Sequence, residues 1–399
     1  MKLAYFVSHP IQYQAPLLRR IAQEQDIELT VFFFSDFSVR NYADPGFGGV
    51  QVRWDVPLLD GYAHEFLPGF RNKGTLGFAT PVSYGIFSRL RSGKFDAVWI
   101  HGYNTLNTLH ALAAARMLNI PAMMRTDSTL EDRSRGRMKL AVKTVFFSFL
   151  RRMVCGILSV GKKNTEYWRD SLGNDVPVFP MPYAVDNDYF RRRSAEAAPD
   201  RETLRCNLNL VPELPVFLFA SKLLPRKRCM DLLEAFLRLA AAGASDPPAY
   251  LLIVGDGEER AALESRIRQS GTANVRMLGF QNQSELPRFF DLCDVFVLPS
   301  IHEPWGLIVN EVMSASRAVV VSDQVGCAPD LIRNGENGFV FPGKNIDALS
   351  KVLRCFLDDS SLAAAMGRKA AETIATFSFD EDVTGLRRAL AFAVPGFVG

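Results

Sequence analysis

The chain has 399 residues, of which 48% are hydrophobic, enough for two α/β domains that each bury a core. No run of 18 apolar residues occurs, which excludes a transmembrane helix, and the N-terminal apolar run is too short for a signal peptide. Six cysteines without a C-x-x-C pair favour neither a disulfide framework nor a zinc site, so we expect a cytoplasmic protein.

The formal net charge of +3 is unevenly distributed along the chain. Residues 1–183 carry +7 and the remainder carries −4, and the segment 133–163 holds nine basic residues and no acidic one. Such a segment is attracted to anionic surfaces, and one interpretation of 133–163 is peripheral contact with the inner face of a membrane. The other is a domain helix that buries its phenylalanines. Nucleic acid is not an expected partner, because the aromatic interleaving of a single-strand groove is missing.

Short apolar runs alternate with helical patterns along the whole chain. In chain order the runs predict strands at 2–7, 28–34, 96–100, 121–125, 154–160, 216–220, 250–254, 275–278, 294–298 and 318–322. The patterns between them predict helices that include 15–25, 105–118, 229–242, 257–269, 307–315 and 361–375. This alternation is typical of Rossmann-like domains with parallel sheets, whose ligands bind beyond the carboxyl ends of the strands.

The alternation breaks around residues 184–214, where an arginine cluster and two prolines occur. We therefore place a domain boundary there. It gives a first domain of 1–185 and a second of 186–375. The remaining segment, 376–399, is expected to pack back toward the first domain. No internal repeat or long low-complexity segment is present.

Polar loops follow predicted strands in the first domain. Ser8 to Gln14 follows the first strand, His101 follows the strand at 96–100, and Asp127 follows the strand at 121–125. At the carboxyl edge of a parallel sheet these side chains would face a ligand. Two alternatives stay open: His101 as a buried structural histidine, and Asp127 as the N-cap of a helix.

In the second domain, two lysines five positions apart lie on the loop after the strand at 216–220. Lys222 and Lys227 would converge on a diphosphate at the start of the next helix, although a solvated basic loop is the alternative. Gly255 follows the strand at 250–254, where a glycine permits close approach of a ligand or simply makes a turn.

The most informative segment is Glu303-Pro304-Trp305-Gly306-Leu307-Ile308-Val309-Asn310-Glu311. Gly306 would let the backbone approach a ligand, and the amides of Leu307 and Ile308 at the start of a helix would form an anion site. Two carboxylates flanking such a site suit a ligand with hydroxyls on either side of a phosphate, such as a nucleotide-sugar. Solvated glutamates on a helix are the alternative.

In order and spacing, these motifs over residues 216–345 resemble glycosyltransferase family 4 (group 1), whose members are retaining enzymes with the GT-B fold. The glutamate pair matches the E-x7-E signature of that family, and Leu278-Gly279-Phe280 resembles the stretch near its nucleotide base. The lysine loop resembles G-R-L-x-x-x-K-G, with Ser221, Lys222 and Arg228 replacing Gly, Arg and Gly. The first domain matches only loosely, since the 8–14 loop lacks the usual glycine pair.

The resemblance implies two Rossmann-like domains facing a cleft, with 1–185 on the acceptor side and 186–375 on the donor side. It also implies transfer of a sugar from a nucleoside diphosphate sugar to a glycan or lipid-linked acceptor. The expected setting is cell-surface polysaccharide or glycolipid biosynthesis. The resemblance also assigns roles to residues of this chain. Lys222 and Lys227 would bind the diphosphate of the donor, together with the backbone of Gly306, Leu307 and Ile308. Glu311 would bind the ribose and Glu303 the sugar. Gly255 and Phe280 would lie near the nucleotide. Asp127 and His101, with Glu303, are the residues expected at the reacting centre.

No cofactor or metal is expected. Asp186-Asn187-Asp188 has the D-x-D form of a metal site but falls in the boundary region, and the lysines would meet the phosphate charge instead. Two other functions stay open. One is an isomerase of the UDP-sugar 2-epimerase kind on the same fold, and the other is a non-catalytic protein that binds sugar nucleotides.

Overall fold

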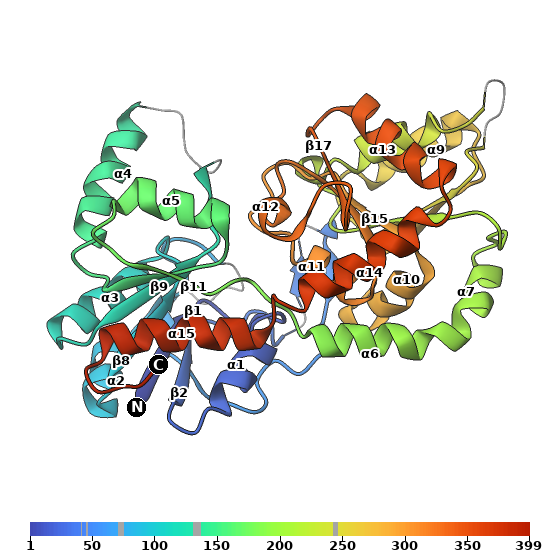
Figure 1. Ribbon diagram of the computed structural model, residues 1–399. Coiled ribbons are helices and arrows are strands. Elements are labelled where there is room, and N and C mark those ends of the chain that lie inside the picture. Colours follow the sequence, from blue (N-terminus) through green and yellow to red (C-terminus); the bar gives the residue numbers. More distant parts are fainter. Residues whose placement is uncertain (41, 45–46, 71–75, 131–136, 242–245) are drawn as a thin grey trace. The chain divides into compact units, whose positions relative to one another are not determined.

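The computed structural model describes residues 1–40, 42–44, 47–70, 76–130, 137–241 and 246–399 (Figure 1). The chain divides into two compact units, each with its own parallel sheet. The first unit comprises Met1–Tyr42, Val56–Val185 and Phe379–Gly399, and the second comprises Ala43–Asp55 and Asp186–Ser378. The α/β class with two parallel sheets, predicted from the alternation of patterns, is confirmed. The excursion of 43–55 into the second unit has no counterpart in the sequence pattern.

The first unit contains a seven-stranded sheet in the order β11-β10-β9-β8-β1-β2-β5, with all neighbouring strands parallel. Its strands are β1 Lys2–Val7, β2 Glu28–Phe33, β5 Ala63–Phe66, β8 Ala97–His101, β9 Ala122–Thr126, β10 Gly156–Ser159 and β11 Val178–Pro180. Two short pairs accompany the sheets: β3 Tyr42–Asp44 with β4 Val50–Val52, and β6 Gly69–Phe70 with β7 Val82–Ser83.

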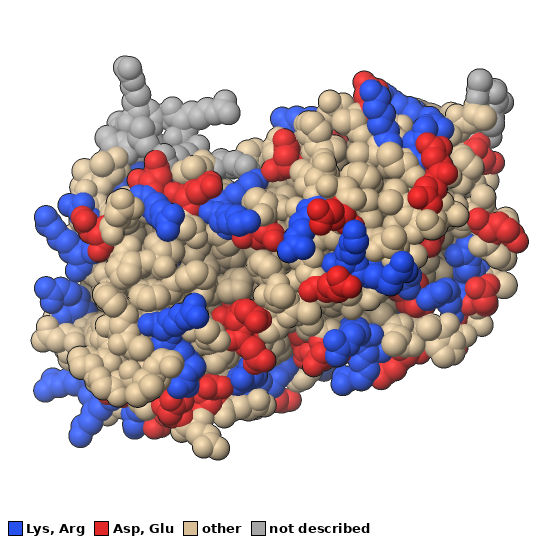
Figure 2. Space-filling model, in the orientation of Figure 1, with Lys and Arg blue, Asp and Glu red and all other residues tan. Residues whose placement is uncertain are grey.

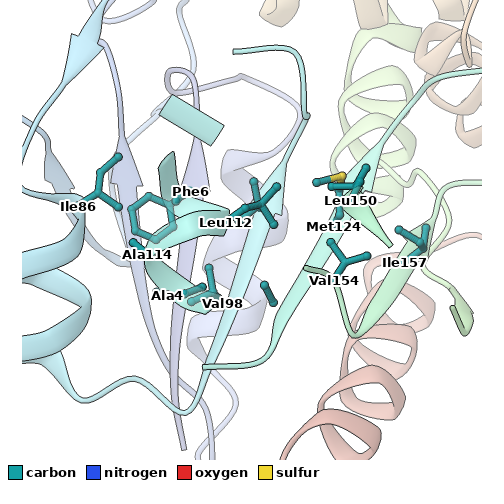
Figure 3. Close-up of a cluster of buried hydrophobic side chains, with 14 of the residues drawn as sticks. Ala4, Phe6, Ile86, Val98, Leu112, Ala114, Met124, Leu150, Val154 and Ile157 are labelled. Atoms are coloured by element: carbon teal, nitrogen blue, oxygen red, sulfur yellow. The ribbon is translucent and has the colours of Figure 1, made fainter. Parts of the chain in front are cut away.

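Helices cover both faces of this sheet because successive strand residues point to opposite sides and both sets are apolar. One face packs against α2 Ile86–Gly93, α3 Leu106–Met117, α4 Arg137–Leu150 and α5 Lys162–Leu172. Figure 3 shows ten of its buried side chains: Ala4, Phe6, Ile86, Val98, Leu112, Ala114, Met124, Leu150, Val154 and Ile157. The other face packs against α1 Ala15–Ala22 and α15 Phe379–Ala393, which contact each other (Figure 1).

The second unit contains a six-stranded sheet in the order β14-β13-β12-β15-β16-β17, again parallel throughout. Its strands are β12 Val216–Ala220, β13 Tyr250–Val254, β14 Val275–Gly279, β15 Val295–Leu298, β16 Ala318–Ser322 and β17 Gly338–Phe341. Strands β12, β13, β15 and β16 are buried along almost their whole length, which is why each appears as a continuous apolar run in the sequence.

The helices of the second unit are α6 Asn187–Ala197, α7 Arg201–Asn207, α8 Cys229–Leu237, α9 Arg260–Ser270, α10 Leu286–Leu292, α11 Leu307–Ser314, α12 Ala328–Leu331, α13 Ile346–Asp358 and α14 Leu362–Ile374. Single 3-10 turns occur at Ala198–Asp200, Pro225–Lys227 and Gln283–Glu285. The break in the sequence pattern around 184–214 therefore contains two helices. Of these, α6 packs on α10 and α11, with the rings of Phe190 and Phe290 6.2 Å apart.

Charged side chains of both signs are interspersed over the visible face of each unit (Figure 2). None of the helices in the described ranges has the length and apolarity needed to cross a bilayer.

Candidate functional site

The predicted donor-side residues lie on loops that leave the carboxyl ends of β12, β13 and β15 in the second unit. Lys222 and Lys227 lie between β12 and α8, Gly255 follows β13, and Glu303 lies between β15 and α11. Because β13, β12 and β15 are consecutive neighbours in the parallel sheet, the three loops emerge at one edge.

Lys227 and Glu303 form the charged centre of this edge. Their side chains are 10% and 11% exposed, and the ammonium of Lys227 donates a hydrogen bond to the Glu303 carboxylate. A second cation, the Arg226 guanidinium, lies 3.8 Å from the same carboxylate oxygen, and the Ile301 amide donates to the Arg226 carbonyl at 2.7 Å. Burial lowers the pKa of Lys227, and the charge of Glu303 opposes that effect.

Lys222 has a different counter-ion. Its ammonium lies 3.0 and 2.9 Å from the two carboxylate oxygens of Asp44, and 4.7 Å from the centre of the Phe47 ring. Its positive charge also acts on Lys227 and helps to lower the pKa of that residue. The charges of the two lysines therefore influence each other, and each lysine contacts its own carboxylate, Asp44 for Lys222 and Glu303 for Lys227.

The start of α11 is shaped by Gly306, whose φ of +94° is unfavourable for other residues. A Cβ at this position would lie 3.1 Å from a methyl carbon of Val325 and 3.5 Å from the Cγ of Glu303. The buried Trp305 indole donates to the Asn310 side chain at 2.9 Å and fixes the entry into the helix. Leu307 and Ile308 are therefore the first two residues of α11, with their amides at its positive end.

Glu311 is the fifth residue of α11, one turn from the helix start. Its side chain is half-buried, and among the described residues it makes no hydrogen bond or ion pair. Desolvation by the surrounding protein raises the pKa of Glu311 to about 8. A partly desolvated carboxyl group without a partner is suited to hydrogen-bonding hydroxyl groups of a ligand.

The glycines after β13 allow two loops of the second unit to pack closely. A Cβ on Gly255 would lie 1.9 Å from the Ser221 carbonyl oxygen, and one on Gly257 would lie 2.5 Å from the Leu223 carbonyl oxygen. The two loops also exchange backbone hydrogen bonds, such as Leu223 N–H to the Asp256 carbonyl at 2.8 Å. The glycines thus hold the Lys222 loop in place.

Phe280, predicted near a nucleotide base, directly follows β14. Its ring makes an edge-to-face contact with Phe47, with ring centroids 4.8 Å apart. Asp44 and Phe47 are residues that motif reasoning missed. No local signal connects them with Lys222 and Phe280, because they come from a different part of the sequence.

In the first unit, His101 ends β8 and lies in a polar cluster at the carboxyl edge of the sheet. The Gln14 amide nitrogen lies 3.4 Å from the His101 ring nitrogens, and the Tyr5 hydroxyl donates to the Gln14 oxygen at 2.9 Å. Burial, together with the charge of Arg125, lowers the pKa of His101 to about 3. His101 is therefore a neutral imidazole at physiological pH.

Asp127 directly follows β9, the neighbour of β8. Helix α4 begins at Arg137, ten positions further along the chain, and residues 131–136 between them lie outside the described residues. Its charge acts on Tyr13 and Tyr183, whose rings are in edge-to-face contact at 5.7 Å, and burial raises the pKa of Tyr13 to about 12. Asp127 and His101 thus lie on adjacent loops of one sheet edge.

Beneath this edge, Arg125 is a buried charge that the sequence analysis missed. It is 1% exposed and donates to Asp382 Oδ1 of α15 at 2.8 Å, and to the carbonyls of Met181 and Pro182 at 2.9 and 3.0 Å. Its guanidinium also lies 4.8 Å from the centre of the Tyr183 ring. Arg125 therefore joins the last helix to the sheet next to the polar cluster.

The D-x-D sequence has another function in the structure. Asp186 caps α6 by accepting from the Tyr189 amide at 2.8 Å, and Asp188 pairs with Arg191 at 2.6 Å. No group of three or more His, Cys, Asp or Glu side chains suited to a metal ion occurs within the described part of the chain.

Comparison with known proteins gives matches of three kinds. The sequence pattern of the family described as "Glycosyl transferases group 1" matches residues 200–373. The chain is 30% identical over 172 residues to the lipopolysaccharide core biosynthesis glycosyltransferase LpsE of Rhizobium meliloti, covering 43% of this chain and 47% of that protein. It is 29% identical over 206 residues to a GDP-mannose-dependent monoacylated alpha-(1-6)-phosphatidylinositol monomannoside mannosyltransferase of Corynebacterium glutamicum, covering 50% and 52%.

Among solved structures, Anabaena Alr3699/HepE in complex with UDP superposes with a TM-score of 0.75 at 18% identity. The match covers 98% of this chain and 100% of that one. The chain spans about half the length of the curated relatives it matches, whereas the structural match extends over both units.

Proposed function

Because residues 200–373 match the sequence pattern of the group 1 glycosyl transferases and the chain has the GT-B fold, we propose that it transfers a sugar from a nucleoside diphosphate sugar. The family resemblance inferred from the motifs is thereby confirmed. The proposed acceptor is a glycan or a lipid-linked sugar, and the proposed setting is cell-surface glycolipid or polysaccharide assembly. The name of the Rhizobium relative, which mentions lipopolysaccharide core biosynthesis, supports this setting, as does that of the Corynebacterium relative, a phosphatidylinositol monomannoside mannosyltransferase.

The observation that carries the proposal is the contact of Lys227 with Glu303 beside the start of α11. A buried cation and the positive end of a helix both favour an anion at this place. We assign Glu303, which contacts Lys227, to hydrogen bonds with sugar hydroxyls, and Glu311, one turn along the helix, to the ribose hydroxyls. A diphosphate carrying a sugar on one side and a nucleoside on the other matches that order of groups.

In the proposed reaction the bond between the anomeric carbon and the diphosphate oxygen breaks. A bond from the acceptor oxygen to that carbon forms on the same face, and the acceptor hydroxyl proton passes to the leaving diphosphate. Lys222, Lys227 and the amides of Leu307 and Ile308 would stabilise the negative charge that develops on the diphosphate. We propose that no metal ion is needed, since these groups supply the compensating positive charge.

For the first unit we propose that Asp127 and His101 contact the reacting sugar or the acceptor. His101 is neutral, so it can accept or donate a hydrogen bond without adding charge. The carboxylate of Asp127, whose charge acts on Tyr13 and Tyr183, would stabilise positive charge that develops at the anomeric carbon.

We further propose that the protein acts in the cytoplasm, with α4 contacting an anionic membrane. Of the basic segment 133–163, residues 133–136 lie outside the described residues. Within α4, Phe147 and Leu150 are buried in the core, whereas Val142, Val145 and Phe149 are 66%, 72% and 61% exposed. Their spacing of three and four places them on one face of the helix, as in interfacial helices.

Liposome sedimentation tests the membrane contact. Val145→Glu should lower recovery with anionic vesicles, whereas Val211→Glu, at an exposed valine of the second unit, should leave it unchanged. Equal recovery of the wild-type protein with neutral and anionic vesicles would remove the membrane from the proposal.

The first test of the function is a thermal-shift screen with UDP-, GDP-, ADP- and dTDP-sugars, with and without EDTA. A ligand at 100 times its Kd adds about 2.7 kcal/mol of stability, so one nucleotide should raise Tm regardless of EDTA. The selected donor is then incubated with and without an acceptor, and NMR follows the anomeric proton. An α-linked product from an α-linked donor supports retention. An epimerised nucleotide-sugar formed without acceptor would identify an isomerase instead, and no Tm shift with any donor contradicts the proposal.

A further inference from the structure

Residues 43–55 precede most of the first unit in sequence but belong to the second unit. The described residues of this segment, here called the strap, are 43, 44 and 47–55. They contact three of the loops that carry proposed donor-site residues. The contacts involve an ion pair, an aromatic pair, a close backbone approach and a pair of hydrogen-bonded anchors.

The ion pair is the contact with the most direct chemical consequence. Both carboxylate oxygens of Asp44 lie within 3.0 Å of the Lys222 ammonium, and the Asp44 side chain is 12% exposed. Carboxylate and phosphate oxygens both accept charge-assisted hydrogen bonds from an ammonium group. Asp44 therefore provides Lys222 with the kind of contact that a diphosphate would provide.

Two neighbouring residues hold Asp44 at this position. Phe47 lies against the Lys222 ammonium and against the ring of Phe280. Gly48 approaches the glycine loop after β13, where its Cβ, if present, would lie 3.6 Å from the Gly257 Cα. The strap thus touches the residues proposed for the phosphate and for the base.

The far end of the strap is fastened independently of Lys222. The Asn282 side chain donates to the Arg53 carbonyl at 2.7 Å, and the Ser284 hydroxyl donates to the Asp55 carboxylate. Loss of the Asp44 contact therefore leaves the strap attached to the loop after β14.

From this geometry we propose that Asp44 is a built-in competitor of the donor diphosphate, which must displace it from Lys222. The inference rests on the proposed function, because it assumes that Lys222 binds the diphosphate. An ion pair of this partial exposure contributes modestly, and its loss corresponds to a change in affinity of about threefold to tenfold. Asp44 would then limit occupancy of the site to ligands with enough negative charge to replace it.

The test compares binding of UDP and of inorganic pyrophosphate by calorimetry to the wild-type chain and to Asp44→Asn. Pyrophosphate is included because its binding does not depend on the base. Asp44→Asn should lower the Kd of a bound probe by about threefold to tenfold. Glu213→Gln removes the same charge from an exposed position of the second unit outside the strap, and should change the Kd by less than about twofold.

A double-mutant cycle then assigns the effect to the pair, since the gain from Asp44→Asn should vanish in a Lys222→Met background. Unchanged or weaker binding by Asp44→Asn, with normal binding by the wild type, overturns the competitor role alone. An equal gain from Glu213→Gln also overturns it, because general charge would then explain the effect. If neither probe binds the wild type or Asp44→Asn, the proposed donor site itself fails.

Discussion

At the scale of single residues, Lys227 and Glu303 depend on each other because both side chains are largely withdrawn from water. A charge buried without its partner costs far more than the pair contributes. The two residues are not equivalent, however. Glu303 lies near Arg226 as well as Lys227, whereas a charged Lys227 has Glu303 as its contacting carboxylate. The loss of either residue should therefore affect stability to a different extent.

We predict that Glu303→Gln and Lys227→Ala both reduce transfer by about 100-fold or more, because each removes an interaction with the departing diphosphate sugar. In denaturant unfolding, Glu303→Gln should lose about 3 kcal/mol, and Lys227→Ala about 1 kcal/mol, since Arg226 still neutralises Glu303. Near-normal transfer by either folded variant removes that residue from the site.

The raised pKa of Glu311 leads to a pH-dependent prediction. Between the ordinary pKa of 4.5 and the folded value of about 8, the folded chain holds a proton that the unfolded chain releases. Stability contributed by this proton therefore falls as pH rises through that window. Glutamine at position 311 does not titrate. The difference between the Tm of Glu311→Gln and the Tm of the wild type should therefore increase as the pH is raised from 5.5 to 8.5.

The matched control for Glu311→Gln is Glu372→Gln, at an exposed position of α14. Calorimetric Tm values are compared at several pH values for the three proteins. A Tm difference between Glu311→Gln and wild type that stays constant with pH would show that Glu311 is ionised in the folded chain at all of them.

At the scale of elements, the sequence was most informative where strands are buried on both faces. The runs 216–220 and 250–254 coincide with β12 and β13, because a strand covered on both sides must be apolar throughout. The expected break at 184–214 instead contains α6 and α7. Arginine-rich α6 has mostly exposed side chains, so its apolar pattern is too sparse to be recognised.

The candidate site was predictable only where its residues follow a strand in one local motif. Glu303, Glu311 and the lysines are readable in this way, since each motif specifies a loop and the helix after it. The contact of Lys222 with Asp44 joins residues 178 positions apart, and no spacing rule relates them. The same is true of Arg125 and Asp382, which are 257 positions apart.

The packing of the glycine loop against the lysine loop gives a prediction for these two elements. Gly255→Ala would force a Cβ to within 1.9 Å of the Ser221 carbonyl at a φ of +135°, so it should cost about 3 kcal/mol or more. Gly271→Ala also has a positive φ, +69°, but nothing lies within 4 Å of its Cβ. It should cost only about 1 kcal/mol in denaturant unfolding. Equal losses would mean that the backbone conformation, and not the loop contact, determines the cost.

At the scale of the whole molecule, the first unit is completed by a helix from the far end of the sequence. Val383, Leu386, Ala389 and Leu390 of α15 are buried against the sheet, and Asp382 pairs with Arg125 beneath the polar cluster. Burial raises the pKa of Asp382 to about 7, and the charge of Arg125 opposes that rise. The contributions of Arg125 and Asp382 to the free energy of unfolding therefore depend on each other.

We predict that Asp382→Ala costs about 3–5 kcal/mol, because it leaves the Arg125 charge buried without its carboxylate. Arg125→Met should also destabilise, since it leaves Asp382 and two carbonyls without their donor. Because both charges disappear together in the double variant, its loss in denaturant unfolding should be smaller than the sum of the single losses by about 2 kcal/mol. Additive losses would show that the pair is not coupled.

The chain passes between the two units four times, after Tyr42, Asp55, Val185 and Ser378. During synthesis on the ribosome, residues 186–378 are therefore made before the first unit has its final helix. Until residues 379–390 emerge, the part of the first sheet that α15 covers stays exposed, and the Arg125 charge lacks the Asp382 carboxylate. The second unit can thus fold before the first unit is complete. During that interval the incomplete first unit exposes apolar surface, which makes it the part most open to chaperone binding and to aggregation.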